Sequence, residues 1–270
     1  MNSPNILFAM VLTILAGLST GIGGFIVMFF KKVNIKLLSI SLGFSAGVMI
    51  YISFVELLAD SKELLISSLG EGMGSWVNVI SFFGGILLIA VIDKLIPSYE
   101  NPHESPRKIE GIEERNIDSG KRLLRTGYFT AVVIAIHNFP EGIATFVSLV
   151  QQPSLGIAVA IAIAIHNIPE GISVAIPVYS ATGNKRKALG WSLISGVGEP
   201  LGALLAYFFF LPILNDTVFG ILFAAIAGIM VFISLDELFP TAEEYGEHHL
   251  AIYGLITGMA VMAVSMLLLA

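Results

Sequence analysis

The sequence contains no cysteine and few charged residues. Asp, Glu, Lys and Arg together make up 13% of its 270 residues, about half of their usual share in a soluble domain. The absence of cysteine excludes disulfides, thiolate metal sites and cysteine nucleophiles, so any chemistry must use His, Asp, Glu or Asn. Hydrophobic residues make up 56% of the chain, and the mean hydropathy is +0.87. This composition excludes a soluble globular protein.

Basic residues are also scarce, and the formal net charge of the chain is -6. Binding to nucleic acid depends on neutralising phosphates with Lys and Arg, so the charge argues against a nucleic-acid partner. Small cations fit this charge better as ligands.

Long apolar stretches account for most of the chain, and a helix needs about 20 apolar residues to cross the hydrocarbon layer. The sequence therefore predicts an all-α integral membrane protein with eight transmembrane helices. These spans cover approximately residues 5–30, 37–59, 76–96, 127–150, 155–179, 189–211, 218–240 and 250–270. The first lacks the basic start and the cleavage site of a signal peptide, so we interpret it as a retained span. We expect a single transmembrane domain over residues 1–270, with one sizeable, flexible polar loop at 97–125.

The Lys and Arg residues predict the orientation of the chain, because short loops rich in them stay on the cytoplasmic side. With eight spans, 13 of the 14 basic residues fall on one face and only Lys62 falls on the other. Both termini are therefore predicted to be extracytoplasmic, and the 97–125 loop is predicted to be cytoplasmic. The sequence indicates a multi-pass protein of the cell membrane, surrounded by the lipid bilayer.

Internal repeats relate two pairs of spans. The segment AIHNFPEGI at residues 135–143 recurs as AIHNIPEGI at 164–172, with eight of nine positions identical. GVMIYISFVELL at 47–58 matches GIMVFISLDELF at 228–239 at six of twelve positions, with an offset of 181 residues. Each pair joins spans that must run in opposite directions, so we expect the eight helices to be arranged as 3+2+3 with inverted pseudo-symmetry. Inverted repeats are typical of transporters, whose substrate site lies near the midplane.

Each copy of the first repeat carries the same three polar residues. His137 and Glu141 are four residues apart, and Asn138 is three residues before Glu141, so all three share one helix face. Span six adds Glu199 near its middle, where the repeat equivalent is Leu18. The candidate metal ligands at the midplane are therefore His137, Asn138, Glu141, His166, Asn167, Glu170 and Glu199.

Three glutamates at the bilayer centre need a counter-charge, because each costs roughly 2.5 to 3.5 kcal/mol if unpaired. No Lys or Arg lies at that depth in the sequence, so divalent ions or protons must supply it. Two imidazoles with two carboxylates form a tetrahedral site that suits zinc and accepts Fe(II), Co(II) or Mn(II). The ligands of this site would be His137, His166, Glu141 and Glu170. The ligands of an adjacent all-oxygen site would be Asn138, Asn167 and Glu199, with Glu141 and Glu170 bridging.

Pro140 and Pro169 lie inside the two ligand motifs. Each lacks the amide hydrogen that would bond the carbonyl four residues earlier, and its ring pushes that turn open. Freed carbonyls at membrane depth are tolerated where they face protein or a wet cavity, and helix breaks are common at transporter ion sites. We therefore expect an opened turn beside each histidine.

The motifs HNFPEG on span four, HNIPEG on span five and GEPLG on span six carry a family resemblance. The sequence resembles the ZIP (zinc- and iron-regulated transporter-like) metal-ion transporters, and within them the bacterial ZupT-like branch, over all eight spans. The resemblance implies import of divalent metal cations into the cytoplasm through a two-metal centre at the seven positions named above. Zinc is the expected substrate, with Fe2+, Mn2+, Co2+ and Cd2+ as further substrates, and no cofactor is expected.

Two other functions stay open on the residues alone. An intramembrane zinc-dependent hydrolase would also use buried His and carboxylates, but it has no need of inverted repeats, so the repeats favour a transporter over an enzyme. A metal-gated receptor is disfavoured because no signalling domain is evident in the sequence. The sequence leaves open the metal preference, coupling to protons and whether the protein forms a homodimer.

Six polar residues near the span ends have a weaker claim to function, since acids at the membrane interface are usually solvated. Three of them would line the entry or exit of a metal path, namely Glu56, Asp236 and Glu237. The other three would receive metal on the cytoplasmic side, namely Asp93, His248 and His249.

Overall fold

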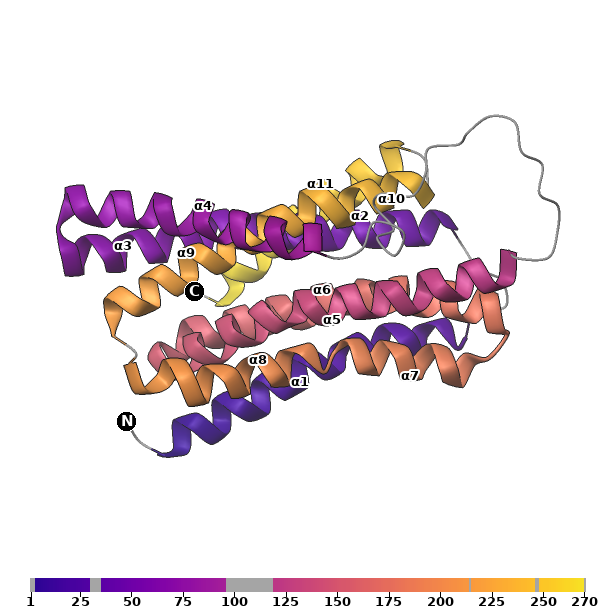
Figure 1. Cartoon of the computed structure of the whole chain (residues 1–270), viewed down its shortest axis with the longest axis horizontal. Coiled ribbons are helices and arrows are strands. Elements are labelled where there is room, and N and C mark those ends of the chain that lie inside the picture. The colour runs from indigo at the N-terminus through magenta and orange to yellow at the C-terminus, as the bar shows by residue number, and fades with distance from the viewer. Residues whose placement is uncertain (1–2, 30–34, 96–118, 214, 246–247, 270) are drawn as a thin grey trace.

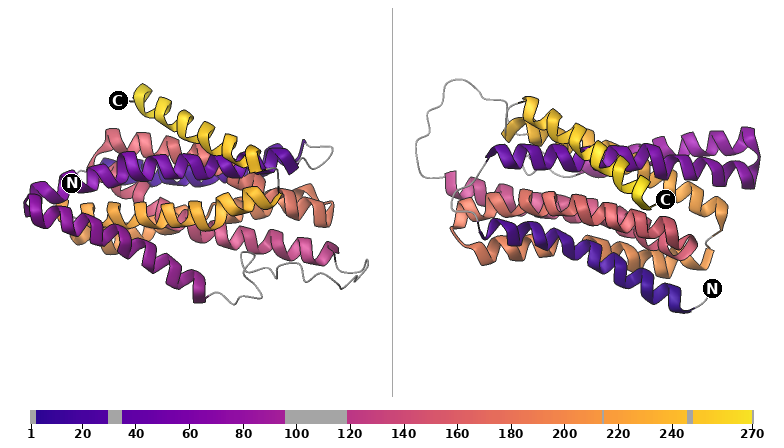
Figure 2. Two further views of the ribbon diagram at one scale, coloured as in Figure 1. Left: turned by 90° about the horizontal axis from the view of Figure 1, so that it is seen from above. Right: turned by 180° about the vertical axis from the view of Figure 1, so that it is seen from behind.

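Figures 1 and 2 show the computed structural model of the chain, which describes residues 3–29, 35–95, 119–213, 215–245 and 248–269. Within these ranges the chain is helical and forms no strand. A helix satisfies its backbone polar groups internally, which is what a chain of this hydropathy requires inside a bilayer. The predicted all-α fold class is therefore confirmed.

The described residues form a series of α-helices, several of which are joined by short turns. In chain order they are α1 (Ser3–Val27), α2 (Ile35–Ile52), α3 (Leu58–Leu69), α4 (Glu71–Leu95), α5 (Ser119–Gln151), α6 (Pro153–Thr182), α7 (Lys185–Ser195), α8 (Gly198–Leu205), α9 (Asp216–Ile233), α10 (Phe239–Tyr245) and α11 (His248–Leu269). Of the polar loop predicted at 97–125, residues 119–125 form the first turns of α5, and the rest lies outside the described residues.

Short π-helical segments join several of these helices into longer rods. Ser53–Leu57 continues α2 into α3, and Ser234–Leu238 continues α9 into α10. Ala206–Phe210 follows α8 and leads into a 3-10 turn at Leu211–Ile213. A π turn adds one residue to the local helix and so changes the direction in which the following side chains point.

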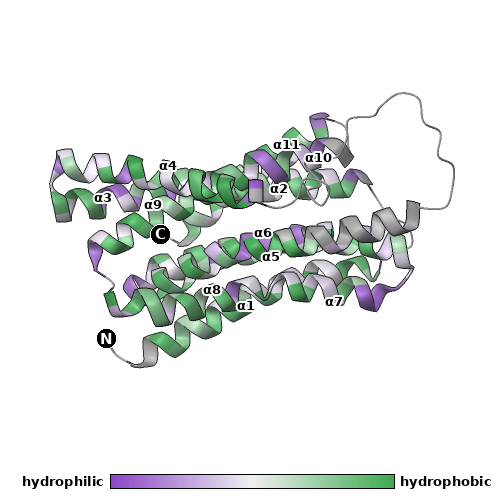
Figure 3. Ribbon diagram, viewed as in Figure 1, coloured by the Kyte–Doolittle hydropathy of each residue, from purple (hydrophilic) through white to green (hydrophobic). Residues whose placement is uncertain are grey.

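Seven helical stretches within the described ranges are long and apolar enough to cross a bilayer. The helix α5, which is 33 residues long, lies where the sequence places span four. The chain is therefore a multi-pass membrane protein. Hydrophobic residues run along most of the helices (Figure 3). Many of them are exposed, most clearly on α4, where Trp76, Ile80 and Phe83 are 68%, 64% and 61% exposed. Lipid would contact this face.

The helices pack as two bundles that lie side by side (Figures 1 and 2). The first bundle consists of α1, α5, α6, α7 and α8, and we call it the ligand bundle because it holds all seven candidate ligands. The second bundle consists of α2, α3, α4, α9, α10 and α11. The main contact between the bundles is that of α2 with α6, and α5 also meets α9.

Glycine lets the helices of the ligand bundle approach one another closely. Gly142 of α5 lies against the backbone of Glu199 on α8, and Gly198 of α8 lies against the carbonyl of Ala135 on α5. A Cβ atom at either glycine would collide with backbone atoms of the other helix. Small residues allow such crossings in membranes, and here they hold Glu199 beside the ligand motif of α5.

Two tight turns mark the opposite ends of the molecule. Gly70 has a φ of 84° between α3 and α4, and Gly183 has a φ of 63° between α6 and α7. Glycine adopts these left-handed conformations without steric cost. α1 begins, and α11 ends, on the side of the molecule on which Gly70 lies (Figure 1). We call the two sides the Gly70 end and the Gly183 end.

Both prolines of the ligand motifs lie inside uninterrupted helices, Pro140 in α5 and Pro169 in α6. The turns that the sequence predicts to open beside the histidines therefore do not divide either helix. As a result, each motif keeps its histidine and glutamate on one helix face, as the four-residue spacing requires.

Candidate metal centre

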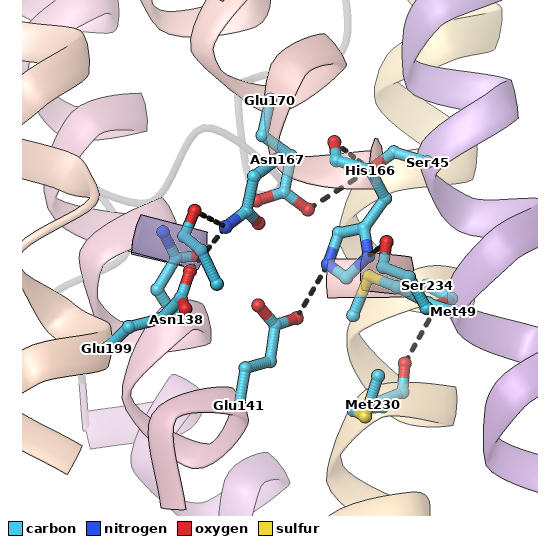
Figure 4. Close-up of polar contacts among 12 residues, drawn as sticks. Ser45, Met49, Asn138, Glu141, His166, Asn167, Glu170, Glu199, Met230 and Ser234 are labelled. Carbon is cyan, nitrogen blue, oxygen red and sulfur yellow. Dashed lines mark hydrogen bonds and ion pairs between the residues drawn. The ribbon is translucent and has the colours of Figure 1, made fainter. Parts of the chain in front are cut away.

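Three predicted ligands meet between α5 and α6. One ligand atom each from Glu141, His166 and Glu170 lies within 4.8 Å of the other two. Glu141 comes from α5 and the other two come from successive turns of α6 (Figure 4). All three side chains are fully buried. A nitrogen and carboxylate oxygens at this spacing form a set that can hold a divalent cation.

The ring of His166 is oriented by the backbone of its own helix. Its Nδ1 lies 3.1 Å from the carbonyl oxygen of Ala162, which can only accept a hydrogen bond, so Nδ1 carries the proton. In the neutral ring Nε2 then offers a lone pair, and it lies 3.2 Å from Oε1 of Glu141. An ionised carboxylate and a neutral imidazole nitrogen are both acceptors, so a proton or a metal ion must lie between them.

The second bundle reaches this group through Ser45 of α2. Its hydroxyl lies 3.1 Å from Oε1 of Glu170 and 3.2 Å from the carbonyl oxygen of His166. The hydroxyl is fully buried and orients a ligand carboxylate from outside the ligand bundle. No sequence pattern distinguishes Ser45 from the other serines of an apolar span, so its contact with Glu170 was not predictable from the sequence.

Three further predicted ligands lie together on the side of α8. Asn167 donates through Nδ2 to Oε1 of Glu199 and, at 3.1 Å, to the carbonyl oxygen of Ala16. Asn138 donates through Nδ2 to the carbonyl oxygen of Ser195 at 3.2 Å. Because both amides use their nitrogens to donate, their oxygens stay available to accept. The atoms of this group that are available to accept are oxygens only.

Buried oxygen atoms without hydrogen-bond partners are concentrated in these two groups. Five such atoms belong to the two groups, namely Oε2 of Glu141, Glu170 and Glu199, and Oδ1 of Asn138 and Asn167, and the hydroxyls of Thr20 and Thr145 are others within the described residues. A buried polar atom without a partner costs free energy, and an unpaired buried charge costs more. These five oxygens accept no hydrogen bond, so their lone pairs are available to bind cations.

The structure places His137 apart from the group of three. Its Nε2 lies 2.5 Å from Oε2 of Glu237, which the π-helical segment Ser234–Leu238 of the second bundle directs inward. Glu237 is only 7% exposed. By sequence, Glu237 lies at a span end, where an acid is usually solvated. Its place in the repeat, equivalent to that of Glu56, is the one sequence signal that points to a function.

The remaining weak candidates are at least partly exposed. Asp236 is exposed and Glu56 is partly buried. His248 and His249 are exposed at the start of α11, where Nδ1 of His248 contacts a carboxylate oxygen of Glu243. Asp93 is partly buried near the end of α4.

Comparison with known proteins identifies a family. The sequence profile described as "ZIP Zinc transporter" matches residues 5–266. The chain is 57% identical to a protein named "Zinc transporter ZupT" from Streptococcus mutans over 98% of this chain and 99% of the relative. Proteins of the same name from Clostridium perfringens and Corynebacterium glutamicum are 57% and 56% identical, over 99% and 97% of this chain and 98% and 99% of the relatives.

Proposed function

The chain belongs to the ZIP family of zinc transporters, and from this premise we propose that it imports divalent metal cations, zinc foremost, into the cytoplasm. The observation that carries the proposal is the buried group of Glu141, His166 and Glu170, whose ligand atoms lie within 4.8 Å of one another. These ligand types bind zinc, and the set also suits Fe2+, Mn2+, Co2+ and Cd2+. The metal is the substrate, so the centre must bind it reversibly.

We further propose that the centre holds two ions. The first ion would lie among Glu141, His166 and Glu170, and the second among the amide oxygens of Asn138 and Asn167 and the carboxylate of Glu199. The buried oxygens without hydrogen-bond partners in both groups support this assignment. Two divalent ions would also neutralise three glutamates at a depth where charge is expensive.

The proposed transport step moves the ligand bundle relative to the second bundle. Transporters built from inverted repeats expose a midplane site to each side in turn by rigid-body movement of one part against another. The two bundles meet beside the ligands, through Ser45 with Glu170 and through Glu237 with His137. A shift of one bundle would therefore change the surroundings of the metal directly.

The proposed orientation has the Gly70 end outside and the Gly183 end in the cytoplasm. The basic residues that follow Gly183 support it, namely Lys185, Arg186 and Lys187, because short basic loops stay on the cytoplasmic side. The hydrolase alternative is not favoured, since ZIP proteins are transporters and not enzymes.

Metal uptake by cells that express the protein tests the proposal. Zinc uptake is expected to exceed that of cells with the Glu141→Ala variant at equal protein level. Unlabelled Fe2+, Mn2+, Co2+ and Cd2+, added one at a time, are expected to compete with zinc. Equal uptake by the protein and the variant would contradict the proposed centre.

A further inference from the structure

Glu56 and Glu237 occupy equivalent positions in two similar pieces of helix. They are related by the offset of 181 residues that superposes residues 47–58 on 228–239. Each is the fourth residue of a five-residue π-helical segment, Ser53–Leu57 or Ser234–Leu238. The first serine of each segment donates to the carbonyl of the methionine four residues earlier, at 2.7 Å in both cases. The repeat therefore extends from the sequence to the local conformation.

The two glutamates differ in their present surroundings. Glu237 is buried and pairs with His137, whereas Glu56 is partly buried on the Gly70 side of the second bundle. The histidine that the other repeat matches to His137 is His166, which instead lies against Glu141 in the centre. One histidine has thus turned toward its repeat glutamate and the other has stayed among the ligands.

An inverted repeat allows these two arrangements to be exchanged. The two halves share these repeat segments, so a local conformation that one half adopts at one end is available to the other half at the opposite end. In the exchanged state His137 would return to the centre, and His166 would turn toward the glutamate that matches Glu237. That glutamate is Glu56.

The present contacts show that this state requires the bundles to shift. Ser45 lies against the backbone carbonyl of His166, and Glu56 follows Ser45 by eleven residues, which is about 16 Å along a helix. The ring of His166 therefore reaches Glu56 only after the ligand bundle has moved along α2 toward the Gly70 end.

We propose that Glu56 is the partner of His166 in the conformation that opens the centre toward the Gly70 end, as Glu237 is the partner of His137 in the present conformation. The inference rests on the proposed transport function. Glu56 is then a positioning residue, because it holds the imidazole of His166 away from the metal in the conformation open to the side of entry. In the present conformation Glu237 holds His137 in the same way, so each conformation withdraws one of the two histidines from the centre.

Pairs of introduced cysteines test the proposal, because the sequence has no native cysteine to interfere. The test protein carries Glu56→Cys and His166→Cys, and the reference protein carries Glu237→Cys and His137→Cys. The control carries Val55→Cys and His166→Cys, since Val55 adjoins Glu56 but points outward and is 46% exposed. Each purified, full-length protein in lipid is treated with a short bifunctional thiol reagent. The mass of the intact protein then distinguishes one reagent that bridges both thiols from two reagents that are each attached to one thiol.

The test and reference pairs are expected to gain one bridging reagent, and the control pair is expected to gain only reagents attached to single thiols. A test pair without the bridge, beside a bridged reference pair, would overturn the proposal, and so would equal bridging of the control. Because the readout does not use transport, these results leave the proposed function standing. That function fails separately if the unmodified protein carries no zinc.

A second measurement uses single variants, so that it does not depend on cross-linking. Glu56→Gln is expected to lower the initial rate of zinc transport about tenfold by disfavouring one of the two conformations. Zinc affinity of the purified protein should change less than about twofold, because Glu56 lies outside the centre. Glu56→Asp, which keeps the carboxylate, is expected to recover part of the rate. Normal transport by Glu56→Gln, or an equal loss of zinc affinity, would contradict the assignment.

Discussion

At the scale of single residues, the proposed transport depends on the metal ligands Glu141 and His166. Glu141 and His166 bring two acceptor atoms to 3.2 Å, an arrangement that only a shared proton or metal stabilises. Loss of an outer-shell partner costs a metal site about 10- to 100-fold, so Glu141→Ala or His166→Ala is expected to lower zinc transport by more than about 100-fold. Radioactive zinc uptake at equal expression measures this.

A matched variant controls for general damage to α6. Ser180 lies on the same helix as His166 and bonds the carbonyl oxygen of Ile176, away from both ligand groups. Ser180→Ala is expected to transport zinc at nearly the normal rate. Near-normal transport by the Glu141 or His166 variant would show that the centre lies elsewhere.

Glu199 tests the proposed second ion. Its Oε1 accepts from Asn167, and glutamine at this position would keep the length and an acceptor oxygen while removing the charge. Glu199→Gln is therefore expected to retain the ion at Glu141, His166 and Glu170 and to lose or weaken the other. Metal analysis of the purified protein counts the ions, and two tightly bound ions in the variant would contradict the assignment.

The same variant should alter the dependence of binding on pH. Ligands must be deprotonated to bind metal, so affinity falls as pH falls, and each proton released adds about one unit to the slope of log affinity against pH. Removing one carboxylate removes one proton acceptor. Calorimetry between about pH 5.5 and 7.5 is expected to give a shallower slope for Glu199→Gln than for the unmodified protein.

The ligand motifs were predictable from the sequence because their spacing is local. A histidine and a glutamate four residues apart share a face in any helix, and two copies on antiparallel spans had to meet. The pairing of His137 with Glu237 was not predictable, since it depends on a π-helical segment and on which bundle faces which. Glu237 lies near the end of its predicted span, and this position alone suggests an acid at the membrane interface.

At the scale of helices, two adjacent glycines on α4 distinguish its packed face from its open face. A Cβ at Gly85 would collide with the backbone of Ala225 on α9, whereas a Cβ at Gly84 meets nothing within 4 Å. Overpacking costs about 1 to 3 kcal/mol, so Gly85→Val is expected to lower the thermal stability of the detergent-solubilised protein. Gly84→Val should change it little. Equal effects of both variants would contradict the packing of α4 on α9.

The positions of the helices were largely predictable from the long apolar runs, but their internal irregularities were not. The span predicted at 37–59 extends through Ser53–Leu57 as far as Leu69, because α3 packs on α4 and α9 beyond the apolar run. Prolines in the motifs suggested opened turns, yet packing keeps α5 and α6 helical through them.

At the scale of the whole molecule, the proposed orientation predicts which thiols are accessible from outside the cell. Ser68 is exposed on α3 near the turn at Gly70, so Ser68→Cys should react with an impermeant thiol reagent on intact cells. Ser105→Cys, in the basic loop outside the described residues, should be shielded until the membrane is opened. The reverse pattern would overturn the orientation.

The grouping of the spans into two bundles could not be inferred from their order along the chain. Consecutive helices α1 and α2 belong to different bundles, and so do α4 and α5. Only the contacts across the fold show that all seven candidate ligands lie in one bundle, with Ser45 and Glu237 reaching them from the other. In the proposed transport step, these two bundles move relative to each other.

Zinc flux into sealed vesicles that contain only the purified protein is the decisive measurement of transport through the metal centre. Zinc is expected to enter vesicles with the unmodified protein and to accumulate inside with time. Vesicles with Glu141→Ala, at the same protein content, should take up no more zinc than protein-free vesicles. Equal flux in the two protein preparations, or no flux above the protein-free vesicles in either, would contradict transport through the centre between α5 and α6.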